Sequence, residues 1–210
     1  MKKEYKNIIF DLGGVLLNIN YRFTEQAFIN IGLHNFNSVY SKAKQSALFD
    51  KFETGKITAG NFRNELRKHL PKNITDNEID KAWNAMLLDL PEERVNLLHQ
   101  LKSNYRLFLL SNTNEIHIRA FEKIYSIEYG KNLFENLFEK YYYSSKIGLR
   151  KPNADCFKFV LQQNKLNPAE TLFIDDSEQH IAGAVKCGLN AIHLKETETI
   201  NEVLKKRKLI

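Results

Sequence analysis

The sequence predicts an α/β fold, in which a doubly wound parallel sheet is interrupted by an inserted helical segment. Short apolar runs recur along the chain and alternate with segments of helical periodicity. Runs of Ile, Leu and Phe that lie between helices are typical of strands buried on both faces, as in a parallel sheet. Strand–helix alternation of this kind gives a doubly wound sheet. A long helical stretch without strand patterns breaks the alternation after the first run.

The expected strands are the apolar runs themselves. Each of the first three ends at a polar residue, and the fourth run is weaker. They cover residues 7–10, 106–110, 171–174 and 191–194. The three tyrosines at 141–143 are also more consistent with a strand and packing than with a substrate platform.

The segments between these runs are expected to be helical. Residues 91–103 begin with proline and two glutamates, as helix N-termini often do, and residues 115–127 and 154–163 share their periodicity. Ser177 is expected to cap a helix that ends near Gly188. Pro152 is expected to begin a helix, which would place Lys151 at its start.

Residues 19–90 are expected to form a helical insert between two parts of the sheet-containing core, residues 1–18 and 91–210. Within it, residues 38–52, 58–70 and 75–88 each have an amphipathic pattern. Thr75 and Glu78 have the spacing of a capping box, in which each side chain bonds to the backbone of the other.

Composition narrows the possible partners. No apolar run approaches the roughly 20 residues that cross a bilayer, which argues against a membrane protein. The net charge of +6 suits anionic partners, but no zinc-finger spacing or basic stripe interleaved with aromatics indicates nucleic acid. The two cysteines, Cys156 and Cys187, provide no disulfide framework, and the N-terminus lacks a signal-peptide pattern. We therefore expect a cytoplasmic protein, and anionic small substrates are one kind of partner that suits its charge.

Polar residues follow three of the predicted strands. They are Asp11, Ser111 and the pair Asp175–Asp176. Because the carboxyl ends of parallel strands share one edge of a sheet, these side chains are expected to converge there. Three carboxylates in one crevice repel each other unless a divalent cation lies among them. Magnesium suits such a site, since it binds through one or two carboxylates and retains waters or phosphate oxygens.

With these residues in view, the sequence resembles the haloacid dehalogenase superfamily. Its four motifs are matched in order by FDLGGVL at 10–16, LLSN at 109–112, GLRKP at 148–152 and FIDDS at 173–177. The resemblance spans residues 10–188 and is greatest to the phosphatase-rich subfamily with a small helical cap, in the branch of the glucose-1-phosphatase-like enzymes. It implies a Rossmann-like catalytic core at residues 1–18 and 91–210 and a cap domain at residues 19–90. It also implies hydrolysis of a small phosphate ester such as a sugar phosphate, with Mg²⁺ as cofactor.

The resemblance also implies a role for each site residue. Asp11 would attack phosphorus to form an aspartyl phosphate, and Lys151 would neutralise the phosphoryl group and steady the nucleophile. The phosphate would lie against Ser111, Asn112 and the glycine turn at Gly14. The metal would be held by the four residues Asp11, Gly13 through its carbonyl, Asp176 and, through water or as a neighbour, Asp175.

Two positions depart from the family pattern. Gly13 stands where most members have an aspartate that acts as general acid and base, a function worth about 10²–10⁴-fold in rate. His180 stands where asparagine is more usual, and a local structural bond is its simpler interpretation. Because Gly13 cannot transfer a proton, a second hypothesis is a protein that binds a phosphometabolite with little turnover. A metal-independent dehalogenase is a third hypothesis, against which the Asp175–Asp176 pair and Lys151 argue.

Overall fold

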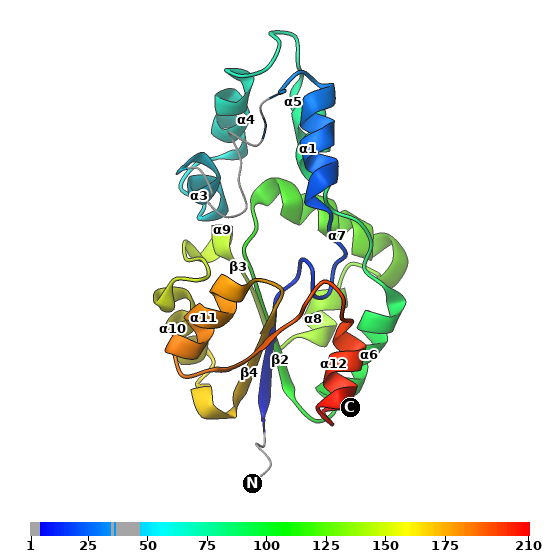
Figure 1. The fold of residues 1–210 in the computed structure, drawn as a ribbon, viewed down its shortest axis with the longest axis vertical. Coiled ribbons are helices and arrows are strands. Elements are labelled where there is room, and N and C mark those ends of the chain that lie inside the picture. Colours follow the sequence, from blue (N-terminus) through cyan, green and yellow to red (C-terminus); the bar gives the residue numbers. More distant parts are fainter. Residues whose placement is uncertain (1–4, 35, 37–46) are drawn as a thin grey trace.

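The computed structural model describes residues 5–34, 36 and 47–210. Its centre is a parallel sheet of five strands in the order β3-β2-β1-β4-β5 (Figure 1). The order reverses on either side of β1, as in a doubly wound fold, so the predicted fold class is confirmed. The strands are β1 (Asn7–Phe10), β2 (Arg106–Ser111), β3 (Lys140–Tyr143), β4 (Thr171–Asp175) and β5 (Asn190–His193).

Helices cover both faces of the sheet because alternate strand residues point to opposite sides. Ile8 and Phe10 pack on one side against α6 (Glu92–Lys102), α7 (Glu115–Tyr129), α8 (Leu133–Leu137) and α12 (Ile200–Lys206). Ile9 and Phe173 pack on the other side against α10 (Ala154–Gln163) and α11 (Glu178–Lys186). Two short elements complete this part of the chain: α9 (Ser144–Ile147) and η1 (Pro168–Glu170).

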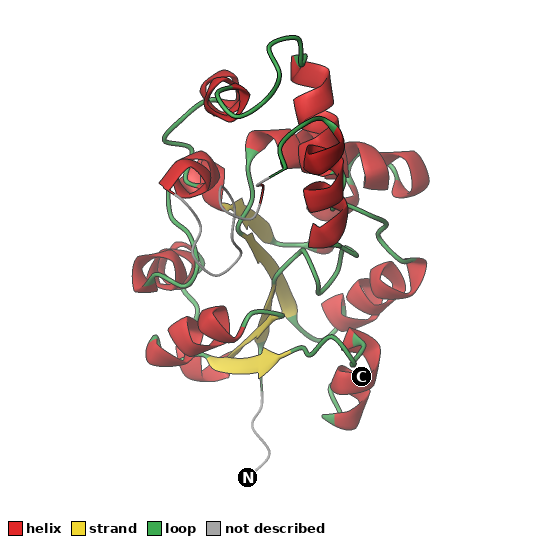
Figure 2. Cartoon of the chain, turned by 45° about the horizontal axis from the view of Figure 1, so that its top comes forward, coloured by secondary structure: helices red, strands yellow, loops and turns green. Residues whose placement is uncertain are grey.

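The remaining helices stand beyond the carboxyl edge of the sheet (Figures 1 and 2). They are α1 (Tyr21–Asn30), α3 (Ala47–Glu53), α4 (Ala59–Arg67) and α5 (Asp76–Asn84). They share an aromatic cluster of their own, in which Phe62 contacts the rings of Phe49, Phe52 and Trp83. Ile116 of α7 joins this cluster, which anchors the helices to the rest of the molecule.

Most element bounds agree with the sequence predictions. The strand at 7–10 and the helix at 154–163 are found as predicted, and the capping box of Thr75 and Glu78 is confirmed. Residues 38–46 of the predicted helix 38–52 lie outside the described residues, and α3 covers only its end. Along the described chain, no helix has both the length and the apolar character needed to cross a membrane.

One predicted helix start is wrong, and one predicted capping bond is absent. The helix expected at Pro152 begins instead at Ala154, so Lys151 precedes it and its side chain turns into the protein. Ser177 occupies the cap position of α11 but makes no capping bond with its side chain. Its backbone N–H instead donates to Asp175 Oδ1 at 2.8 Å. Both differences arise because contacts at the sheet edge determine the loop conformation there.

Candidate active site

Asp11 lies directly after β1, the central strand, with its side chain at the carboxyl edge of the sheet. The Leu12 N–H donates to Asp11 Oδ1 at 2.7 Å, and Lys151 Nζ lies 2.9 Å from the same oxygen. The side chain is nearly enclosed, with 7% of the residue exposed. Burial raises the pKa of Asp11 to about 8 against the attraction of Lys151, and the charges of Asp175 and Asp176 add to the rise. A second cation near Asp11 would therefore favour the carboxylate form that a nucleophile requires.

Lys151 is fully buried between two carboxylates. Its Nζ contacts Asp11 Oδ1 and lies 2.6 Å from Asp175 Oδ2. Burial acts to lower the pKa of Lys151, but the two carboxylates raise it above its ordinary value, so the ammonium group stays charged. An ammonium group held in this way is a fixed positive charge beside the candidate nucleophile.

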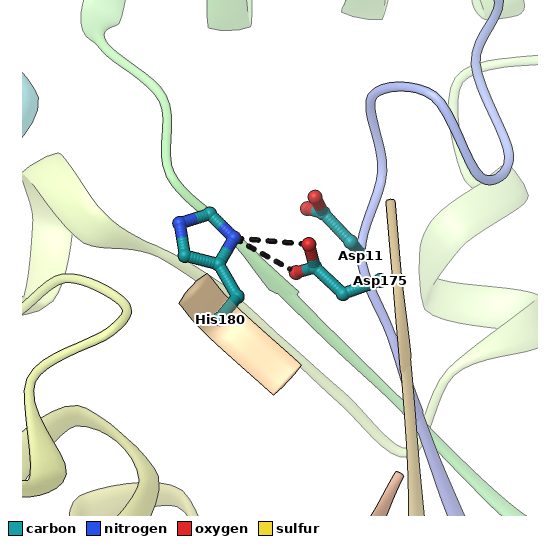
Figure 3. A group of neighbouring side chains, drawn as sticks. All are labelled: Asp11, Asp175 and His180. Atoms are coloured by element: carbon teal, nitrogen blue, oxygen red, sulfur yellow. Dashed lines mark hydrogen bonds and ion pairs between the residues drawn. The ribbon is translucent and has the colours of Figure 1, made fainter. Parts of the chain in front are cut away.

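Asp175 ends β4 and is a structural partner of three groups. It accepts hydrogen bonds from Lys151 Nζ, the Ser177 N–H and His180 Nδ1, the last at 2.9 Å (Figure 3). Burial opposes its ionisation, yet the charge of Lys151 and the bond from His180 hold the pKa of Asp175 well below its usual range. The local bond expected of His180 is thus formed, and it orients the carboxylate that fixes Lys151.

Asp176 follows Asp175 in the chain but faces a different environment. It lines the same cavity as Asp11, at the carboxyl edge of the sheet. Its carboxylate presses against the turn after β1, where a Cβ atom built on Gly14 would lie 2.7 Å from Asp176 Oδ2. Gly14 has φ of +77°, so the turn needs glycine there for conformation as well as for space. The structure therefore brings Asp11 and Asp176 together from opposite ends of the sequence.

Gly13 also lines the cavity, and the space beside it is already filled. A Cβ atom at Gly13 would lie 3.1 Å from Ile19 Cδ1. An aspartate in this position would require the Ile19 side chain to move. The glycine at this position therefore agrees with the packing of Ile19 against it. Position 13 supplies a backbone carbonyl and no proton-transferring side chain.

The segment after β2 connects two of the family motifs. The Asn112 side chain donates to the Lys151 carbonyl at 2.9 Å and accepts from the Lys151 N–H at 3.0 Å. Ser111, Asn112 and Thr113 line the cavity beside Asp11. The cap of α7 is Asn114, which accepts from two backbone N–H groups, so neither Ser111 nor Asn112 is needed for helix capping. Asn112 thus aligns the loop that carries Lys151 with the end of β2.

The donor set fits magnesium. Among the described side chains, ligand atoms of three residues lie within 4.8 Å of one another: Asp11, Asp175 and His180. The Asp175 carboxylate, however, already forms an ion pair with Lys151 and a hydrogen bond with His180. A cation there would compete with Lys151. The Asp11 and Asp176 carboxylates and the Gly13 backbone all border the cavity, and Asp176 is near enough for its charge to raise the pKa of Asp11. Hard oxygen ligands of this kind are those that Mg²⁺ prefers.

The cavity also contains residues that the sequence did not single out. Glu53, at the end of α3, and His117, in the first turns of α7, both line it. Arg150 lies behind Glu53 and pairs with it, with 3.0 Å between Nη2 and Oε2. Glu53 lies in the helical insert and His117 shows no ligand spacing in the sequence, so only tertiary packing reveals their position.

Comparisons with known proteins agree with this geometry. A family model described as a haloacid dehalogenase-like hydrolase matches residues 5–188. A D-ribitol-5-phosphate phosphatase from Bacteroides thetaiotaomicron is 33% identical over 177 residues, which cover 84% of this chain and 85% of the relative. A sesquiterpene phosphatase from Aspergillus oryzae is 26% identical over 213 residues, covering 100% of this chain and 99% of the relative.

A solved structure shows the same architecture. It is an Asp-to-Ala mutant of a haloacid dehalogenase family enzyme from B. thetaiotaomicron, in complex with magnesium and inorganic phosphate. It superposes with a TM-score of 0.89 and 34% identity, covering 95% of this chain and 98% of that chain. The match to both core and helical insert means that the whole arrangement is shared.

Proposed function

The chain belongs to the haloacid dehalogenase-like hydrolase family, and from this premise we propose that it is a magnesium-dependent phosphatase of small phosphorylated metabolites that uses Asp11 as a covalent nucleophile. One observation carries the proposal: Asp11 and Asp176 border one cavity while Lys151 Nζ lies 2.9 Å from Asp11 Oδ1. The similarity to a D-ribitol-5-phosphate phosphatase supports polyol or sugar phosphates as the substrates of this chain.

In this proposal, an Asp11 carboxylate oxygen attacks phosphorus as the bond between phosphorus and the leaving oxygen breaks. Water then attacks the aspartyl phosphate, which releases inorganic phosphate and restores the carboxylate. Magnesium, when bound, supplies charge stabilisation for the phosphoryl oxygens. Because Gly13 has no side chain, the proton for the leaving oxygen comes from solvent or from another residue of the cavity.

Each remaining residue has a proposed task that follows from its position. Lys151 places a fixed positive charge beside the phosphoryl group, and the Asp175 carboxylate holds Lys151 in place. Ser111 and Asn112 bind phosphoryl oxygens at the end of β2, and the Gly14 turn supports Asp176 and the nearby backbone. Such a site works mainly by positioning and electrostatic stabilisation, as phosphoryl transfer requires.

We further propose that residues 19–90 act as a cap domain over this site. The separate aromatic cluster of α1, α3, α4 and α5 supports this division, as does the presence of Glu53 and Trp83 in the cavity wall. Cytoplasmic location is also part of the proposal, and the two free thiols of Cys156 and Cys187 are consistent with a reducing compartment.

The test is a phosphate-release screen over sugar, polyol and other metabolite phosphates, with magnesium and with a chelator. We expect release that requires magnesium and is lost in Asp11→Asn. Tight binding of a phosphate ester without release would favour a binding protein, and chelator-resistant activity on a 2-haloacid would favour a dehalogenase. Either result would overturn the proposal.

Metal ligation has its own test. Asp176→Asn is expected to raise the magnesium concentration needed for half-maximal activity. The matched change Asp175→Asn is expected to release Lys151 and lower kcat even at saturating magnesium. If instead Asp175→Asn and His180→Gln alone weaken the response to magnesium, the metal lies between those residues and this assignment is wrong.

A further inference from the structure

Glu53 places an acidic group in the part of the cavity that faces the helical insert. It is the last residue of α3 and is 8% exposed, and it borders the same cavity as Asp11 and Ser111. Asp11 and Asp176 are already assigned to the nucleophile and metal. Glu53 is thus the one further carboxylate among the described residues of the cavity wall.

Arg150 fixes the position of Glu53 relative to the catalytic end. Its Nη2 lies 3.0 Å from Glu53 Oε2, and its Nη1 donates to Asp50 Oδ1 at 2.8 Å. Arg150 precedes Lys151 in the chain, so one loop holds both the charge beside the nucleophile and the clamp on Glu53. Arg150 itself is 6% exposed and is not part of the cavity wall, whereas Glu53 is.

His117 adds a second hydrogen-bond acceptor to this wall. Its Nδ1 lies 2.9 Å from Asn84 Oδ1 and therefore donates, and its ring stacks on Trp83 at 4.6 Å between centroids. Burial lowers the pKa of His117 to about 3, so the ring stays neutral and Nε2 is an acceptor. Glu53 and His117 can thus accept hydrogen bonds from substrate hydroxyl groups. Neither offers the cavity a donor that could bind a substrate carboxylate.

The negative charges of the cavity wall also bear on which leaving groups the site accepts. Among the described members of the wall are three carboxylates and no lysine or arginine; Lys151 and Arg150 pair with Asp11 and Glu53 from behind the wall. A leaving group with a second anion would meet Glu53 at close range, and such like-charge contacts are an effective means of rejecting a competing ligand.

Building on the proposed function, we propose that Glu53 makes this phosphatase select neutral, hydroxyl-bearing leaving groups and reject leaving groups that carry a carboxylate or a second phosphate. Glu53 is a specificity-determining residue in this proposal. It accepts hydrogen bonds from substrate hydroxyls, Arg150 holds it in place, and His117 contributes a second acceptor.

The experiment compares two esters that differ at one end. D-ribitol 5-phosphate has a terminal hydroxymethyl group where D-ribonate 5-phosphate has a carboxylate. We expect wild-type kcat/KM to favour the ribitol ester by about 10²-fold, the scale of a like-charge penalty at an interface. In Glu53→Gln this ratio should shrink about tenfold or more, chiefly because kcat/KM for the ribonate ester rises.

Two further variants serve as controls. Glu65→Gln removes the same charge from α4, where Glu65 pairs with Lys68 on the surface, and should leave the ratio unchanged. Glu53→Asp keeps the charge and should keep most of the discrimination. Circular dichroism melting checks that each variant is folded, and Asp50 remains available to pair with Arg150 when Glu53 is changed.

Equal use of the two esters by the wild type would overturn the inference, as would an unchanged ratio in folded Glu53→Gln. In both cases magnesium-dependent phosphate release would persist, so the proposed function would stand. Absence of release from every phosphate ester tested would overturn both.

Discussion

The carboxyl edge of the sheet and the helices of residues 19–90 organise their polar groups in different ways. At the sheet edge, Asp11, Lys151 and Asp175 form a buried chain of charges with contacts of 2.9 and 2.6 Å. In the helical insert, the centre is aromatic, and Arg63 and Asp80 pair nearer the surface.

The difference separates chemistry from recognition. The sheet edge holds buried charges that, in the proposed function, act on a phosphoryl group. The insert contributes Glu53 and Trp83 to the cavity from an aromatic cluster of its own. Its described ion pairs to the loop that carries Lys151 run through Arg150. Substitutions in the two regions should therefore have separable effects on turnover, stability and substrate choice.

The largest effect is expected at the nucleophile. Asp11→Asn should reduce kcat by about 10⁴-fold or more, because in the proposed mechanism the Asp11 carboxylate forms the covalent intermediate. Lys151 keeps its bond to Asp175, so the variant should remain folded. Steady-state phosphate release with saturating magnesium measures the loss. Activity within about tenfold of the wild type would exclude covalent catalysis by Asp11.

Removal of the buried cation should have the next largest effect. Lys151→Met leaves Asp11 and Asp175 without their partner in a buried site, which should lower the free energy of unfolding by about 3 kcal/mol. Urea denaturation at neutral pH without magnesium measures this change. Lys158→Met, at an exposed position of α10, is the control and should change stability by no more than about 0.5 kcal/mol. Equal stability of both variants would contradict a structural charge chain.

His117, at the boundary between the two regions, should make the free energy of unfolding depend on pH. Unfolded His117 takes up a proton near pH 6.5, whereas in the folded protein burial lowers its pKa to about 3. The contribution of neutral His117 to the free energy of unfolding is complete above pH 6.5 and is lost as the pH falls toward 3. Between pH 7.5 and 5 the free energy of unfolding should fall by about 2 kcal/mol from this group.

Urea denaturation across this range should show a smaller loss in His117→Gln than in the wild type. His99→Gln, on the exposed side of α6, should keep the wild-type loss. If His117→Gln and the wild type lose the same free energy on acidification, His117 is not held neutral against Trp83.

The smallest effect compares the same motif in both regions. Capping boxes begin α5 at Thr75 in the insert and α12 at Thr199 in the core. Thr75→Ala and Thr199→Ala should each lower stability by about 1 kcal/mol, because each removes a bond to an N-terminal backbone N–H. Neither should change kcat. A selective loss of activity in Thr75→Ala would mean that turnover depends on the stability of the insert.

The sequence predicted the sheet edge far better than it predicted the cavity wall. Strand β1 at residues 7–10 was readable because a strand buried on both faces is continuously apolar and ends at Asp11. The capping box at Thr75 was readable for a similar reason, since all of its contacts lie within one turn.

Contacts that join distant segments leave no such local pattern. Lys151 appeared to begin a helix, yet its side chain is fully buried because Asp11 and Asp175 attract it into the core. Glu53 and His117 reach the cavity only because the aromatic cluster seats the insert on α7. Their positions depend on packing between regions, which one sequence does not encode in any short motif.

The most direct test of the account is chemical trapping of the intermediate. Wild-type protein is mixed with magnesium and an ester that it hydrolyses, quenched in acid during turnover and reduced with borohydride, which converts an aspartyl phosphate to homoserine. Peptide mass mapping should then find homoserine at position 11 only when substrate was present. Unmodified Asp11 in an enzyme caught during turnover, or modification at Asp175 or Asp176 instead, would contradict it.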